Sequence, residues 1–218
     1  MDFLFGLFEF ALSRPEKVIE RVIQHTGYVA SVLVTAAFLA VVTGILTRKS
    51  QLAKELSLSV ASVFLTIPSL ALFVIFIPFV GLGFAPSFIA LLLYSLLPIL
   101  RNTITGLEGI DAGVLESAKG MGLSSTQVLL TVQLPLAWPV ILAGLRVSSM
   151  LVVGLAALAT LVAGGGLGDF IKDGLARLPL PNSYESIWLG TLLSLVLAVI
   201  IDLILQALRV ATISKGIR

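Results

Sequence analysis

The chain has 218 residues, of which 58% are hydrophobic and 12% are charged, and its mean hydropathy is +1.10. Soluble domains carry about 25% charged residues, so this composition excludes a water-soluble fold and predicts an all-α integral membrane protein. The absence of cysteine excludes disulfides, and the single histidine leaves little scope for a metal site or a catalytic triad. The net charge of +2 comes from scattered basic residues, which argues against nucleic-acid binding.

The first segment, residues 1–24, is expected to be interfacial or extracytoplasmic. Met1–Leu12 contains Asp2 and Glu9 but no basic residue, which argues against a cleaved secretory signal. A dozen residues cannot cross a bilayer core of about 30 Å, so this stretch predicts a short interfacial helix. Residues 25–218 are expected to form one transmembrane domain, with His25 at its interfacial edge.

Long uncharged stretches then predict five transmembrane helices. The 45 residues of Leu56–Leu100 are about twice what a bilayer core needs, so this stretch turns back once, near Gly81–Pro86. Pro68 and Pro78 are expected to bend the helix before that turn. The helices are expected near residues 27–47, 56–80, 84–100, 138–162 and 186–208.

The positions of lysine and arginine predict an outer N-terminus and a cytoplasmic C-terminus. One side of the membrane is expected to carry eight basic residues: Arg48, Lys49, Lys54, Arg101, Lys119, Arg209, Lys215 and Arg218. The other side is expected to carry five: Arg14, Lys17, Arg21, Lys172 and Arg177. The segment between the third and fourth helices, residues 108–135, is therefore expected to lie in the cytoplasm.

This cytoplasmic segment predicts two short helices. Asp111 is a suitable N-cap for a helix over Ala112–Gly120, and Gly122 suits the left-handed position that ends it. Ser124 and Gln127 have the spacing of a capping box for a second helix over residues 125–133. Pro135 is suited to the first turn of the helix that re-enters the membrane. Together these signals predict a compact helix-turn-helix knob.

The same segment carries a longer pattern, formed by Glu116-Ser117-Ala118, Gly122 and Val132-Gln133-Leu134-Pro135. It resembles the EAA loop of permease subunits of ATP-binding-cassette (ABC) importers, in which E-A-A, three residues, G, nine residues and I-x-L-P follow one another. All spacings match, while Ser117 and Val132 depart in residue type. The resemblance implies a MetI-like permease fold and assigns ATPase docking to Glu116, Ala118 and Gly122, with Leu134 and Pro135 as anchors. Alternatively, Glu116 and Lys119 form an ordinary solvated pair.

The chain has no phosphate-binding loop of the G-x-x-x-x-G-K-[ST] type. Its one glycine cluster, Gly164–Gly168, lacks the lysine and is expected to be a mobile turn after the fourth helix. We therefore expect no enzyme activity in this chain, with ATP and magnesium bound by a separate ATPase subunit.

Two charged residues lie inside predicted spans, Arg146 in the fourth helix and Asp202 in the fifth. Because ionisable residues in membranes usually pair, we expect an ion pair between them; snorkelling to the interface and a role in the substrate path are the alternatives. Small residues in Ala61-Ser62, Ser69 and Gly154–Ala157 would allow close contact with a second permease, although packing within the chain explains them equally well.

Three further stretches, Thr66–Ala71, Gly81–Pro86 and Leu93–Thr103, resemble the osmoprotectant permeases that import glycine betaine, choline or carnitine. The resemblance implies a bacterial inner-membrane importer with two permease chains (copies or paralogues), two ATPase chains and an extracytoplasmic solute-binding protein. Import of an amino acid such as methionine, or of another small solute, is the alternative within this class. A secondary transporter that works alone is a further alternative, although no paired inverted repeat is evident.

Overall fold

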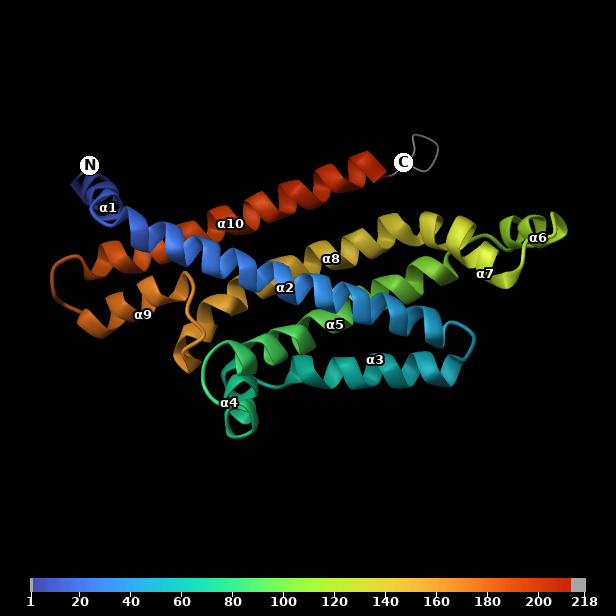
Figure 1. Ribbon diagram of the computed structural model, residues 1–218, viewed down its shortest axis with the longest axis horizontal. Helices are drawn as coiled ribbons and strands as arrows, with labels where there is room; N and C mark the ends of the chain where they lie inside the picture. Colours follow the sequence, from blue (N-terminus) through green and yellow to red (C-terminus); the bar gives the residue numbers. More distant parts are fainter. Residues whose placement is uncertain (1, 213–218) are drawn as a thin grey trace.

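The computed structural model describes residues 2–212, with side chains from residue 4, so Lys215 and Arg218 lie outside the described residues. The described part is helical (Figure 1). Its elements are α1 (Asp2–Leu12), α2 (Pro15–Thr47), α3 (Gln51–Thr66), α4 (Ser69–Val80), α5 (Phe84–Glu108), α6 (Ala112–Gly120), α7 (Ser125–Val128), the π-helical turn η1 (Leu129–Gln133), α8 (Leu134–Ala156), the 3-10 helix η2 (Ala157–Val162), α9 (Gly168–Arg177) and α10 (Ser183–Thr212).

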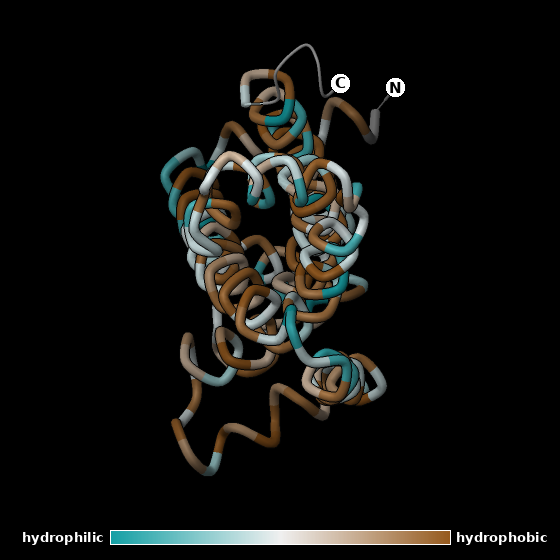
Figure 2. The backbone as a smooth tube through the Cα atoms, turned by 90° about the vertical axis from the view of Figure 1, so that its right-hand side faces the viewer, coloured by the Kyte–Doolittle hydropathy of each residue, from teal (hydrophilic) through white to brown (hydrophobic). Residues whose placement is uncertain are grey.

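Five apolar segments of the described residues are long enough to cross a membrane, if the bent pair α3 and α4 is counted as one. The other four are α2, α5, α10 and the continuous stretch Ser125–Val162. Large hydrophobic side chains lie on the outer surface as well as in the core, and Figure 2 shows hydrophobic stretches all around the bundle. This agrees with the predicted number of spans and with an apolar surrounding.

The second predicted helix is not one helix but two. It is broken between Thr66 and Ser69, and α3 and α4 are inclined by 101° to each other. Pro68 explains the break, because the residue before a proline is sterically excluded from helical geometry, and Ile67 is extended with ψ 132°. The Tyr94 hydroxyl donates a hydrogen bond to the freed Ile67 carbonyl. The expected bend at Pro68 is confirmed, but it interrupts the helix completely, whereas Pro78 lies inside α4.

Helix α2 begins ten residues earlier than the predicted domain boundary at residue 25, with Pro15 in its first turn. Its 33 residues span about 50 Å at about 1.5 Å per residue, which exceeds a bilayer core of about 30 Å. Helix α1 packs against α10 rather than standing alone. The N-terminal segment therefore belongs to the same packed body as the spans.

Helix α5 forms the centre of the bundle, where it packs against α2, α3, α4 and α8. Contact with α8 is close at Gly144, where an added Cβ would lie 2.7 Å from both the Asn102 Cβ and the Pro98 oxygen. Of the small residues expected at a seam, Ala61 is buried within the chain, whereas Gly154 is exposed with no atom within 4 Å of an added Cβ. Gly154, unlike Ala61, therefore lies on a surface that a neighbouring molecule could contact closely.

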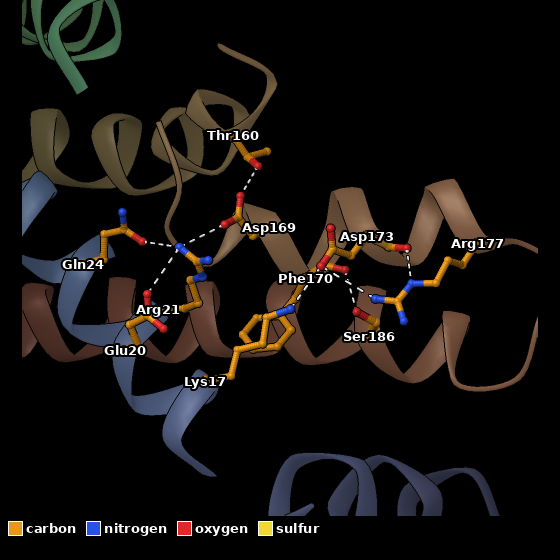
Figure 3. Close-up of polar contacts among 10 residues, drawn as sticks. All are labelled: Lys17, Glu20, Arg21, Gln24, Thr160, Asp169, Phe170, Asp173, Arg177 and Ser186. Carbon is orange, nitrogen blue, oxygen red and sulfur yellow. Dashed lines mark hydrogen bonds and ion pairs between the residues drawn. The ribbon is translucent and has the colours of Figure 1, made fainter. Parts of the chain in front are cut away.

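At the end of the bundle that holds the N-terminus, ion pairs join α2 to α9 (Figure 3). Lys17 Nζ lies 3.1 Å from Asp173 Oδ2, and an Arg21 guanidinium nitrogen lies 3.1 Å from Asp169 Oδ2. The Thr160 hydroxyl donates to the same Asp169 carboxylate. These contacts fix α9 against the first span and the end of η2.

The glycine turn between η2 and α9 is also held by α2. Gln24 Oε1 accepts from the Gly166 N–H at 3.1 Å, and His25 Nδ1 accepts from the Leu167 N–H at 3.2 Å. The other ring nitrogen of His25 lies 3.3 Å from the Val153 carbonyl oxygen. His25 is only 1% exposed, and hydrogen bonds at both ring nitrogens allow the ring to be buried in the protein. Its expected position at the membrane interface stays a prediction.

Candidate coupling site

A compact knob, defined as residues 111–133, projects from the end of the bundle opposite the N-terminus (Figure 1). Its first helix, α6, has the predicted bounds. The Asp111 carboxylate accepts from the N–H groups of Gly113 at 2.8 Å and Val114 at 3.3 Å, which satisfies two free donors of the first turn. Sequence-local capping therefore explains where α6 begins.

Gly122 ends α6 in the left-handed conformation, with φ +84°. This geometry directs the Gly122 N–H to the Lys119 carbonyl at 2.9 Å and the Leu123 N–H to the Ala118 carbonyl at 3.3 Å. Two carbonyls at the helix end are thereby satisfied. Since an added Cβ would meet no atom within 4 Å, the requirement for glycine here is one of backbone conformation, not of space.

The second helix of the knob starts with the predicted capping box. Ser124 Oγ accepts from the Gln127 N–H at 3.3 Å, and Gln127 Oε1 accepts from the Ser124 N–H at 2.8 Å. Helix α7 then passes into α8 without a break, through the π-helical turn η1. Pro135 explains this widening, because its ring and missing N–H are poorly accommodated by regular helical hydrogen bonding. The knob is therefore continuous with a membrane span.

The five residues assigned to the coupling loop have different surroundings. Glu116 and Gly122 are exposed, while Ala118 is only 2% exposed. The Ala118 methyl group is therefore covered within the isolated chain, and its part in ATPase docking stays a prediction. Leu134 is half-buried against an apolar cluster of α5, η1 and α8, whereas Pro135 is exposed.

Sequence reasoning did not single out the large apolar side chains that the knob exposes. Met121 is 74% exposed at the turn after α6, and Val114 is 42% exposed on α6 itself. Contiguous exposed apolar surface is typical of protein contact sites. The signal was available, because Met121 lies between two glycines in a capping turn, where no core position is expected.

A bidentate ion pair joins α8 to α10 at their partly exposed junction. Arg146 Nε lies 2.7 Å from Asp202 Oδ1, and an Arg146 terminal nitrogen lies 2.8 Å from Asp202 Oδ2. The two side chains are 30% and 20% exposed in the isolated chain. Two parallel charge-assisted hydrogen bonds fix both distance and orientation. The structure thus brings together the two charged residues that the sequence places in the spans.

Residues 33–212 match the family model described as binding-protein-dependent transport system inner membrane component. The chain belongs to this family. It is similar to the carnitine transport permease protein OpuCB of Listeria monocytogenes, with 39% identity over 89% of this chain and 88% of the relative. It is also similar to the choline transport system permease protein OpuBB of Bacillus subtilis (strain 168), with 35% identity over 90% and 89%.

A third relative of this permease is the osmoprotectant import permease protein OsmW of Salmonella typhimurium, with 35% identity over 89% of this chain and 91% of the relative. Among solved structures, an inward-facing conformation of the MetNI methionine ABC transporter matches with a TM-score of 0.77 and 21% identity. That match covers 89% of this permease and 95% of the solved chain, and it establishes the MetI-like fold.

Family membership makes the permease a multi-pass membrane component of a transport system, and not itself a catalyst. It also gives a physical reason for the exposed apolar side chains of α10, which include Val199, Leu203 and Ile204. Lipid or a neighbouring subunit covers such groups in a membrane, where in water they would favour aggregation.

Proposed function

We propose that this permease is the membrane subunit of an ATP-driven importer of osmoprotectants of the glycine betaine, choline and carnitine type. The observation that carries the proposal is the capped knob, whose residues have the spacing of the EAA loop. The knob lies at one end of a helical bundle that belongs to this permease family. The proposed class of solute is supported by similar permeases that are named for transport of carnitine, choline and osmoprotectants. Methionine is the weaker candidate, because the similarity to a methionine transporter is one of fold at 21% identity.

A cytoplasmic ATPase subunit, which binds ATP and magnesium, docks against the exposed side of α6. Glu116 supplies a charge that orients the contact, and Val114 and Met121 supply apolar surface that the ATPase buries. Gly122 holds the turn that follows Met121 in shape. Because the knob runs through η1 into α8 without a break, a rigid-body movement of the ATPase moves α8 directly.

The Arg146–Asp202 pair transmits this movement from α8 to α10. Its bidentate geometry resists both sliding and rotation of one helix against the other. Leu134 anchors the base of the knob in the apolar cluster around Leu107 and Ile141. Alternating access then arises at the interface of two permease chains, since one thin bundle cannot enclose a solute path.

The knob end of the bundle faces the cytoplasm, and a solute-binding protein docks at the opposite end. The chain has no cysteine, which allows a clean test with single cysteines at two exposed positions, Ser117 and Lys172. A membrane-impermeant maleimide should label K172C in intact cells and S117C only after the membrane is opened. Labelling of S117C from outside would contradict both this orientation and ATPase docking.

The function is tested by uptake into proteoliposomes that contain the permease, its cognate ATPase and its binding protein. We expect ATP-dependent accumulation of radiolabelled betaine, choline or carnitine, and no accumulation when the ATPase is omitted. Unlabelled methionine in excess serves as the specificity control and should not compete. Uptake that persists without ATP would instead identify a transporter that works alone.

A further inference from the structure

A cavity of about 320 Å³ lies between the α2–α3 turn, the end of α5 and the knob. Its lining includes four cationic side chains, Arg48, Lys49, Lys54 and Lys119, and a single carboxylate, Glu108. The positive groups come from two segments that are far apart in the sequence. The fold therefore gathers a positively charged concavity at the base of the knob.

Most of this positive charge is not neutralised within the protein. Lys54 forms an ion pair with Glu108, and the Arg48 guanidinium donates to the Ile45 carbonyl at 2.7 Å. Among the described residues, Lys49 and Lys119 have no ion-pair partner, and both are exposed. The charges of Lys54 and Glu108 cancel each other, so three uncompensated positive groups remain around the cavity. Their positive potential favours binding of an anion inside the cavity.

The position of the cavity along the bundle suggests where this anion comes from. Arg48 and Lys49 directly follow the last residue of α2, and Lys54 lies in the first turn of α3. The cavity is therefore at the level where apolar spans give way to polar chain, and α6, whose Leu115 and Lys119 line it, extends away from the spans (Figure 1). Lipid phosphates lie at this level of a membrane, and anionic lipids attract basic groups there.

We propose that this cavity binds the phosphate of an anionic phospholipid headgroup from the leaflet on the knob side. Its volume is at the low end of the range of about 300–1,000 Å³ for ligand pockets, which suits a headgroup. Ser125 and Gln133 add hydrogen-bonding groups to the lining, and Leu107 and Leu115 add apolar wall. A bound phosphate would bridge the α2–α3 turn and Lys119 of the knob.

The test is native mass spectrometry of the full chain released from nanodiscs that contain equal amounts of dioleoylphosphatidylglycerol and dioleoylphosphatidylcholine. The wild type should retain phosphatidylglycerol selectively. K49Q/K119Q should bind it about 30-fold more weakly, because each basic group near an anionic lipid contributes about fivefold. Both side chains are exposed, so the helical circular dichroism of this variant should match that of the wild type.

The matched control is R101Q/R209Q, which removes two charges from helices α5 and α10 outside the cavity lining. It should retain the affinity of the wild type. Equal weakening in both double variants would mean general surface attraction and would overturn the proposal, as would undiminished binding in K49Q/K119Q. Displacement of phosphatidylglycerol by millimolar inorganic phosphate would identify the free ion as the ligand and overturn the lipid source. All of these readouts are independent of transport.

Discussion

Gly122 offers a direct way to loosen the knob, because its backbone conformation ends α6. Its φ of +84° is unfavourable for an L-residue, and a left-handed residue costs about 1–2 kcal/mol. An added Cβ meets no atom within 4 Å, so Gly122→Ala should cost this conformational strain alone. Since the hydrogen bonds to the Lys119 and Ala118 carbonyls depend on this geometry, the strain should raise local opening of α6 by a factor of about 5–30.

Hydrogen exchange of the α6 amides in the full chain measures this opening. Gly120→Ala is the matched control, because Gly120 is a helical residue without positive φ and with equally open space around it. Gly122→Asn should lie between the wild type and Gly122→Ala, since asparagine tolerates the left-handed region better. Unchanged exchange in Gly122→Ala, or equal acceleration in Gly120→Ala, would refute the conformational argument.

Three further predictions concern transmission of movement through the permease. Glu116→Lys should abolish most solute-stimulated ATP hydrolysis in the assembled importer. Because Glu116 is exposed, the free energy of unfolding of the permease should change by no more than about 0.5 kcal/mol. Normal stimulation would contradict docking through this residue. Met121→Ser should weaken ATPase binding by roughly tenfold in a titration, because burial of a methionine contributes about 1.5–3 kcal/mol. Single charge reversals at Arg146 and Asp202 should lower the thermal unfolding temperature in detergent, and the double reversal should recover most of the loss; no recovery would count against a structural pair.

Local chemistry is what the sequence determined most accurately. The bounds of α6 followed from Asp111 and Gly122, because capping involves only neighbouring residues of the chain. The number of apolar segments followed from gaps between charges, since a bilayer imposes a fixed length on any helix that crosses it. Even the Arg146–Asp202 contact could be anticipated, because two charges stranded in apolar helices have few other partners.

Only the tertiary structure decided which side chains are buried and where helices are continuous or broken. Ala118 and His25 are buried by contacts with other turns and helices, which no local pattern encodes. No local pattern encodes the continuity of α7 with α8 or the completeness of the break at Ile67 either. The Ile67 carbonyl that this break frees accepts a hydrogen bond from the Tyr94 hydroxyl on α5. Burial and the satisfaction of freed backbone groups depend on residues distant in the chain, so they are fixed only when the helices pack together.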